Sequence, residues 1–405
     1  MKNNVLLGFS EVDITPASSV QTIGFNRKDN MSKGVLHKLF AQISVWHSKE
    51  EKCCLVAIDH IGFSCHEADL LRDLIGNKLG ITRDKIMLCF SHTHSAPNVS
   101  IEPEYFSFLC SQVILGVGEA ESNLEPIKAA WGMVEANIGI NRRDENGILD
   151  RRVAVLKIAH AEDSNLRLLI LRVTAHANVL LRDNYLISSD FIGVTRNLLE
   201  EKYGCKVMIT QGASGNVKPK YSGSLKSLDK MAIEIKNSID KCIENLKPQT
   251  IKNLSMFSQK ESFFADVPTL EQAKKISAEA MNENNIDGSN WLKEVNRLHS
   301  EGIKQQSKDI EIQYLKLNEG CLCGVANEIM CEIAVDVAKT CNNELIYLGG
   351  YTNGCDGYLP TAEEYSKGGY EVLHSYLIYY IYHGTVMPLN PDTARKLVKL
   401  ISKQL

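Results

Sequence analysis

The strongest constraint on the fold is the alternation of short apolar runs with segments of helical periodicity. Lys52–Asp59 reads KCCLVAID, an apolar run of strand length, and His66–Leu79 follows with apolar residues near helical spacing. The same order recurs at Lys85–Ser91 and Phe106–Ala120. Further strands are expected at 151–159, 166–175, 206–210, 310–317, 321–325 and 344–348, and further helices at 190–203, 228–246 and 328–340. This pattern predicts an α/β (or α+β) fold, in which helices flank a mixed sheet.

The 405 residues contain no linker-like stretch rich in Gly, Ser or Pro, so we expect one domain over 1–405. The charged stretch at about 270–306 is expected to be a helical insertion, with a break at Asn284–Ser289. The aromatic run Tyr376–Tyr382 is short and more typical of a core segment than of a membrane span.

Composition excludes several classes of protein. A net charge of −4 gives no nucleic-acid footprint, and no segment has the roughly 20 apolar residues that span a bilayer. The start lacks a signal-peptide core. Twelve cysteines lie partly inside apolar runs such as Cys321-Leu322-Cys323, and no Cys-x-x-Cys pair exists. We therefore expect reduced cysteines and a cytoplasmic protein.

The chemistry is concentrated where expected strands end. The stretch Cys89–Asn98 reads CFSHTHSAPN, and alternate residues of an extended chain point the same way, so His92 and His94 are expected to face one spot. His176 follows another strand, as does Glu328, and a third strand leads into the loop that holds Tyr351 and Tyr358. Zinc binds imidazole nitrogen and carboxylate oxygen, and catalytic sites keep one position open for water.

Each feature also has a simpler interpretation. Glu328 fits an acidic residue at a helix start, where the helix dipole favours it, and Tyr358 fits a core aromatic residue. Asp59 fits either a carboxylate near a metal site or a helix cap. Spacing alone does not assemble these residues into one site.

Eight segments occur in an order that is informative in combination: GFSEVDITP (8–16), IGF (23–25), SHTHSAPN (91–98), NRR (141–143), VTAHAN (173–178), QGASGNVKP (211–219), GVANE (324–328) and GYTNGCDGYLPTAEEYSKGGYEV (350–372). Together they resemble the neutral/alkaline non-lysosomal ceramidase family, in its zinc-bearing amino-terminal domain and its shorter bacterial relatives. The resemblance runs from Gly8 to about Val372, apart from the stretch 270–306.

The resemblance implies a role for each matching residue. It implies one Zn²⁺ per chain, held by four ligands: His92, His176, Glu328 and Tyr358. It places His94 beside the metal as a proton donor or transition-state stabiliser. It places Arg142 opposite the substrate carbonyl or the oxyanion that forms from it.

The sequence also departs from the family pattern. Lys218 stands where ceramidases carry a serine regarded as catalytic, and Asn216 stands where they carry an aspartate. Lys218 fits either a contact to a substrate carboxylate or phosphate or an exposed loop lysine. We also expect no carboxyl-terminal immunoglobulin-like domain and no secretion signal, which favours a substrate more soluble than ceramide.

The function expected from the sequence is a zinc-dependent hydrolase that cleaves a carboxamide of a small or medium-sized soluble substrate with a metal-activated water. The alternatives are an acyl-transfer, lactone- or ester-opening or condensing enzyme of a biosynthetic pathway, a true ceramidase, and a metal-binding protein without turnover. The expected partner is a small molecule, with no nucleic acid and no membrane span, and the oligomeric state is left open.

Overall fold

The computed structural model describes residues 5–405, and its largest sheet has nine strands there. Eight of them follow the order β4-β3-β2-β1-β5-β7-β8-β9, and the ninth, β11, pairs with β5. Their bounds are β1 Leu6–Asp13, β2 Phe40–His47, β3 Lys52–Ile58, β4 Ile86–Phe90, β5 Glu125–Glu135, β7 Arg152–His160, β8 Leu166–Val173, β9 Lys206–Gln211 and β11 Gln249–Thr250. The pairs β3/β4 and β8/β9 are parallel, and the other pairs are antiparallel. The predicted fold class is confirmed.

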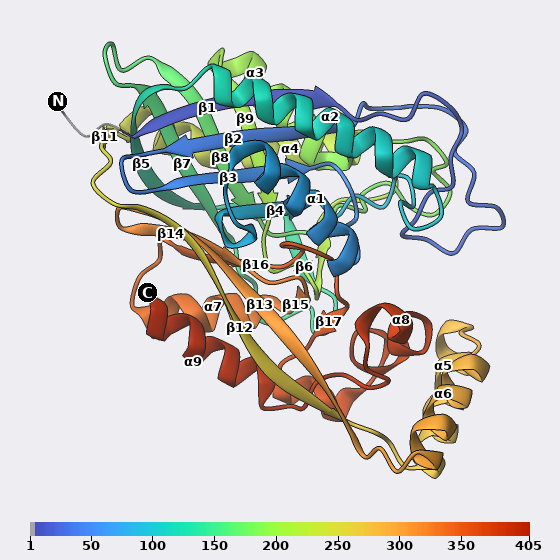
Figure 1. Cartoon of the computed structure of the whole chain (residues 1–405). Helices are drawn as coiled ribbons and strands as arrows, with labels where there is room; N and C mark the ends of the chain where they lie inside the picture. The colour runs from blue at the N-terminus through green and yellow to red at the C-terminus, as the bar shows by residue number, and fades with distance from the viewer. Residues whose placement is uncertain (1–4) are drawn as a thin grey trace.

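The large sheet folds back on itself between β1 and β5. These strands pair only through Leu6 with Pro126 and Leu7 with Glu125. At the two ends of the strand order, β9 contacts β3 and β4, and β7 and β8 run across β1, β2 and β3 in Figure 1. The space between the two halves is filled by buried apolar side chains, among them Phe9, Trp46, Leu55, Met87, Trp131, Leu156 and Ile170.

Helices cover both outer faces of this folded sheet. The helices α1 (Cys65–Leu79) and α2 (Pro103–Ser122) pack against β1, β2 and β4, while α3 (Asp190–Tyr203) and α4 (Leu225–Asn245) pack against β5, β7 and β9. Each parallel strand pair needs a crossover connection, and α1 and α3 provide these connections. The sequence marks the ends of α1 clearly: Ser64 and Glu67 form a capping box, and Gly80 ends the helix in the left-handed conformation.

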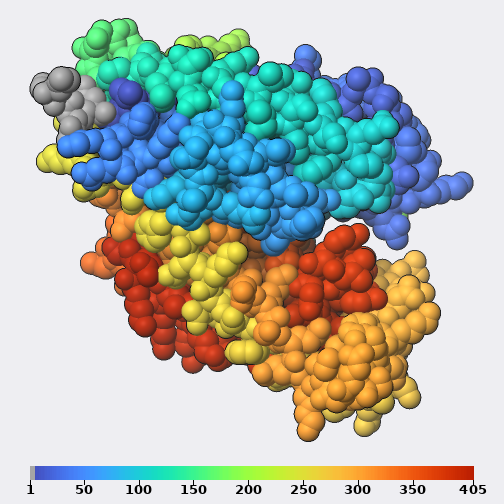
Figure 2. Space-filling view, in the orientation of Figure 1, coloured from blue at the N-terminus to red at the C-terminus, as the bar shows by residue number. Residues whose placement is uncertain are grey.

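A second sheet has the order β12-β13-β14-β16, with β12 Leu254–Asp266, β13 Gln305–Leu317, β14 Gly320–Gly324 and β16 Ile346–Gly349. The long hairpin β12–β13 carries α5 (Leu270–Asn284) and α6 (Ser289–Ser300) at its tip. The predicted helical pair is therefore present, and Figure 2 shows it as an orange protrusion at the lower right. It packs against α8 (Tyr376–His383) and the short turn η3 (Tyr370–His374).

Several small elements complete the chain around the junction of the two sheets. They are the short turns η1 (Arg83–Lys85) and η2 (Ala362–Lys367), the paired strands β6 (Gly139–Asn141) with β10 (Val217–Pro219), and the parallel strands β15 (Glu328–Ile329) with β17 (Tyr358–Leu359). The helix α7 (Cys331–Cys341) packs on β16, and α9 (Thr393–Gln404) packs on α7. None of the helices in residues 5–405 combines the length and apolar character that crossing a bilayer requires.

The expectation that Tyr376–Tyr382 is a core segment is only partly correct. Tyr376 and Leu377 are buried, but Ile378 is 41% exposed, Ile381 65% and Tyr382 50%. The segment forms α8, which packs by one face on η3 and α6. Its other face is apolar and open to solvent.

Arg172 joins the two sheets. Its side chain is 1% exposed and extends from β8 toward the second sheet. There Nη1 donates to the carbonyl oxygens of Cys323 (2.6 Å) and Tyr347 (2.7 Å), while Nε donates to Thr210 Oγ1 (3.1 Å). The carbonyl oxygens belong to β14 and β16, so one guanidinium satisfies buried polar groups of both sheets.

We predict that Arg172→Met lowers the free energy of unfolding by about 2–5 kcal/mol, because it leaves the Cys323 and Tyr347 carbonyls without this donor. Denaturant unfolding measures the change. The control is Arg395→Met, which removes an exposed arginine of α9 and is expected to cost less than about 0.5 kcal/mol. Equal stability of the two variants would contradict the role of Arg172.

Candidate functional site

His92 lies two residues beyond β4 in a left-handed backbone conformation, with φ +61°. Its backbone N–H donates to the carbonyl of His60 (2.8 Å), and its ring Nδ1 lies 2.6 Å from the carbonyl oxygen of Ile61. A carbonyl only accepts, so Nδ1 carries the proton and Nε2 keeps its lone pair. The sequence predicted that His92 and His94 point the same way because they alternate along a strand, and this reason is wrong. The strand β4 ends at Phe90, and the loop after β3 orients the ring of His92.

His176 lies three residues beyond β8 and faces His92. Its Nε2 is 3.1 Å from Nε2 of His92, and its Nδ1 is 2.8 Å from the carbonyl oxygen of Ser214. Burial lowers the pKa of His176 well below its usual value, and the neighbouring Arg142, His92 and His94 lower it further. The ring is therefore neutral at physiological pH.

Glu328 reaches the same place from β15, shortly after β14 of the second sheet. Its Oε2 is 3.3 Å from Nε2 of His92 and 3.6 Å from Nε2 of His176. Burial by itself raises the pKa of Glu328, but His92, Arg142 and the hydroxyl of Tyr351 outweigh it, and the pKa lies below its usual value. The prediction of a helix beginning at Glu328 is wrong, because Glu328 belongs to β15 and α7 begins at Cys331.

The three atoms fit a bound cation. With Nδ1 protonated on both rings, two nitrogen lone pairs and a carboxylate oxygen face one another, an arrangement that repels unless a positive charge lies among them. Two ligands of a tetrahedral zinc, each about 2.0–2.1 Å from the ion, lie about 3.3–3.4 Å apart. The observed separations of 3.1, 3.3 and 3.6 Å match this spacing.

His94 is the third imidazole of the cluster. The ligand atoms of His92, His94 and His176 lie within 4.8 Å of one another. Nδ1 of His94 lies 2.9 Å from the carbonyl oxygen of Gly24, while its Nε2 is buried and has no hydrogen-bond partner among the described residues. Burial and then His92 hold its pKa well below the usual value. Gly24 is required there, since a Cβ would lie 2.8 Å from the ring of His94.

Arg142 follows β6 and lies against this cluster. Its Nη2 is 2.8 Å from Nδ1 of His176, and its Nη1 is 3.3 Å from a carboxylate oxygen of Glu371. Nδ1 of His176 has only one in-plane partner, so Ser214 and Arg142 cannot both bond to it. If Nδ1 donates its proton to Ser214, this N–H of Arg142 is free for another acceptor.

Two tyrosines complete the centre. Tyr358 is paired with Glu328 across β15 and β17, and it is 6% exposed. Tyr351 is fully buried and stacks on His92, with ring centroids 4.0 Å apart, while its hydroxyl donates to Glu328 Oε2 (3.3 Å). Burial, followed by the charge of Glu328, raises the pKa of both phenols well above the usual value. Sequence reasoning gave Tyr351 no role, because nothing in the sequence separates it from other loop tyrosines.

Lys218 is not brought to this cluster. Its side chain is exposed on β10, although the neighbouring residues of the loop point inward. Asn216 is one of these, and it is fully buried. It accepts from the backbone N–H of Cys331 (2.9 Å) and donates to the carboxylate of Glu332 (2.8 Å), which ties the loop to the start of α7.

A cavity of about 370 Å³ opens onto the histidines. Residues 60–64 and 98–100 form one wall, and Tyr358, Tyr370 and α8 form the opposite wall. Figure 2 shows α8, in red, facing the blue amino-terminal segments across an indentation at the right. The cavity contains His92, His94 and Glu328 among its lining residues, and within residues 5–405 Glu328 is the only Asp, Glu, Lys or Arg that lines it.

Comparison with known proteins gives a fold. No protein-family model matches the chain, and no curated protein matches its sequence. The crystal structure of neutral ceramidase from Pseudomonas aeruginosa is similar with a TM-score of 0.75 and 17% identity, over 99% of this chain and 74% of that chain. A structure described as ceramidase complexed with C2 has a TM-score of 0.73 and 16% identity over the same shares. The chain has the fold of neutral ceramidases, and the resemblance seen in the sequence is confirmed at that level.

The buried His60 makes the stability pH-dependent. Its Nε2 donates to the carbonyl of Pro97 (2.7 Å), its Nδ1 accepts from the N–H of Gly62 (3.0 Å), and burial lowers its pKa to about 4. The unfolded chain therefore binds this proton at higher pH, near 6.5. Stability from this group is present above pH 6.5 and is lost as the pH falls toward 4.

We predict that His60→Gln removes up to roughly 3 kcal/mol of the stability change between pH 6.5 and 4. The free energy of unfolding of both proteins, measured at pH 7, 6 and 5, checks this. His94 and His176 titrate in both proteins, so the difference isolates His60. Parallel pH profiles would contradict the prediction.

Proposed function

We propose that the protein is a metal-dependent amide hydrolase and that the metal is zinc. The observation that carries the proposal is the convergence of His92 Nε2, His176 Nε2 and Glu328 Oε2 within 3.1–3.6 Å, in a chain with the neutral ceramidase fold. Imidazole and carboxylate are a zinc-type donor set. Tyr358, next to Glu328 at the cavity wall, is the fourth proposed ligand.

When bound, zinc supplies an acidified water that is a nucleophile near neutral pH. The surrounding residues orient the atoms that would bind it. Ser214 and Ile61 hold the protons on Nδ1 of His176 and His92, which leaves both Nε2 atoms free to bind. Tyr351 fixes the carboxylate of Glu328. The site is therefore oriented before any metal or substrate arrives.

His94 is proposed to move the proton. Its Nδ1 faces the carbonyl of Gly24 and its Nε2 has no hydrogen-bond partner among the described residues, so the Nε2 lone pair is placed to accept a proton from the attacking water and to pass it to the leaving amide nitrogen. Arg142 lies against Nδ1 of His176, behind the cavity wall, so the proposed contact of its N–H with the carbonyl oxygen, where negative charge develops, requires its side chain to turn toward the cavity. No serine nucleophile is needed for this reaction, which agrees with the presence of Lys218 at the family's serine position.

The cavity supports an uncharged substrate. Apart from Glu328 its walls carry no carboxylate, lysine or arginine, and α8 presents Ile378, Ile381 and Tyr382 at the mouth. This apolar mouth favours an amide with an apolar group over the more polar soluble amide expected from the sequence, so ceramide-type hydrolysis is the second candidate. The twelve unpaired cysteines support the proposal of a reducing, cytoplasmic location.

We predict about one zinc per chain, lost in His92→Ala and in His176→Ala. Elemental analysis of purified protein measures the metal content. The control is His47→Ala, which removes an exposed histidine at the end of β2 and is expected to keep the metal. A folded wild-type protein that binds no metal when supplied with zinc would contradict the proposal.

We predict that the zinc-loaded protein hydrolyses N-acyl amides and that kcat/KM rises with acyl-chain length. Replacing Ile381 with Ser should flatten this dependence while the rate on the shortest amide is unchanged. Release of amine and carboxylate is measured by chromatography, including N-acylsphingosine in detergent. If the metal-loaded protein is inactive on every amide, amide hydrolysis is contradicted. If it is active but kcat/KM does not depend on acyl-chain length, the preference for an apolar substrate is contradicted.

A further inference from the structure

His92 is held by the segment directly after β3. The backbone N–H of Ser91 donates to Ile58 O (3.0 Å), and that of His92 donates to His60 O (2.8 Å). Nδ1 of His92 donates to Ile61 O (2.6 Å). Three hydrogen bonds onto four consecutive residues therefore set both the backbone and the ring of His92. Whatever fixes the segment 58–61 also fixes the direction of the His92 Nε2 lone pair.

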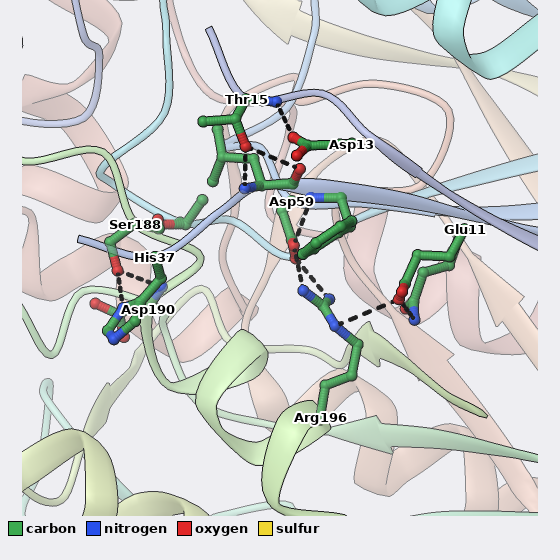
Figure 3. A network of polar contacts seen from close by, with 12 residues as sticks. Glu11, Asp13, Thr15, His37, Asp59, Ser188, Asp190 and Arg196 are labelled. Carbon is green, nitrogen blue, oxygen red and sulfur yellow. Dashed lines mark hydrogen bonds and ion pairs between the residues drawn. The ribbon is translucent and has the colours of Figure 1, made fainter. Parts of the chain in front are cut away.

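The side chain of Asp59, inside this segment, is locked from the other side. Its carboxylate oxygens lie 2.8 and 3.2 Å from Nη2 and Nη1 of Arg196, and one of them accepts from the backbone N–H of Phe40 (3.0 Å). Asp59 is 2% exposed and Arg196 is 3% exposed. Figure 3 shows this two-pronged pair at the centre of a polar network. Asp59 is thus neither a helix cap nor a metal ligand.

Arg196 is itself held on several sides. Its guanidinium lies 5.3 Å from the ring centroid of Phe40, and its Nε is 3.9 Å from a carboxylate oxygen of Glu11. Glu11 also accepts from Lys206 (2.7 Å). The guanidinium therefore has a fixed position on α3, and it transmits that position to Asp59.

The beginning of α3 also holds the two loops that carry the histidines. Asp190 accepts from the backbone N–H groups of Val179 (3.2 Å) and Leu180 (3.0 Å), which follow His176. The carbonyl of Ser188 accepts from Thr93 Oγ1 (2.7 Å), between His92 and His94. Figure 3 places Ser188 and Asp190 beside the same network. The beginning of α3, with the residue Ser188 just before it, therefore contacts both loops that carry the imidazoles.

A contribution to stability alone does not explain the buried ion pair of Asp59 and Arg196. A buried ion pair contributes little net stability compared with apolar residues of similar volume, although breaking it leaves a costly unpaired charge. Its two-pronged geometry does, however, restrict the orientation of Asp59 and hence of the backbone at His60 and Ile61. Groups that orient metal ligands typically change metal affinity by 10–100-fold.

We propose that Arg196 is a positioning residue for the candidate metal centre. Through Asp59 it fixes the carbonyl groups of His60 and Ile61, which in turn hold His92 with its Nε2 lone pair toward His176 and Glu328. This inference rests on the proposed function, because it requires His92 to bind the metal. It adds a residue that touches neither metal nor substrate.

The test is the affinity of the purified full chain for Zn²⁺ and Co²⁺, measured by competition with a chelator, together with the visible spectrum of the Co²⁺ form. Arg196→Met and Asp59→Asn are expected to weaken binding 10–100-fold and to change the Co²⁺ bands. The matched control is Arg152→Met, because Arg152 forms a similarly buried pair with Asp150 (2.8 Å) outside the cavity. This control is expected to keep wild-type affinity and spectrum.

The double variant Asp59→Asn/Arg196→Met separates positioning from stability. It leaves no unpaired buried charge, so its stability should recover toward wild type, whereas its metal affinity should stay low. Recovery of affinity together with stability would overturn the proposal. If Arg196→Met does not fold, Arg196→Lys decides: several-fold weaker binding supports positioning, and wild-type binding overturns it. A wild-type chain without metal affinity overturns the proposed function itself.

Discussion

The contact between the two sheets is the constraint on which the candidate site depends. His92 and His176 follow strands of the large sheet, whereas Glu328 follows a strand of the second sheet. The three side chains meet only because the sheets are held in one relative position, and the buried guanidinium of Arg172 bonds to strands of both. The packing of the two sheets therefore determines the distances between the three side chains, since a shift of one sheet would move Glu328 away from the imidazoles.

Most of the polar groups around the cluster act on orientation. The main-chain carbonyl of Ile61 fixes the Nδ1 proton of His92, Ser214 and Arg142 contact Nδ1 of His176, and Tyr351 fixes the carboxylate of Glu328. The left-handed backbone at His92 and Tyr351 is part of the same arrangement, because these conformations cost energy and persist only where surrounding contacts enforce them. The fold therefore holds two imidazole lone pairs close to a carboxylate, at a cost in stability.

The sequence predicted those features that local patterns determine. Continuous apolar runs located β3, β4, β8 and β9, and capping residues agree with the ends of α1. The strands β1, β2, β5 and β12 were not predicted, because polar residues or glycine interrupt their apolar runs. The direction of His92, the strand position of Glu328 and the exposed place of Lys218 depend on contacts between distant segments. The ordered motifs identified the fold, but spacing alone did not supply this geometry.

The helices α5 and α6 support the wall of the cavity without lining the cavity themselves. These helices pack on α8 and η3, which form a cavity wall, yet none of their own residues lines the cavity. Substitutions or length changes at the tip of the β12–β13 hairpin can therefore reshape the wall without touching the reacting groups. The cavity wall and the histidine cluster thus rest on different parts of the chain, and α8 and η3 connect the hairpin tip to that wall.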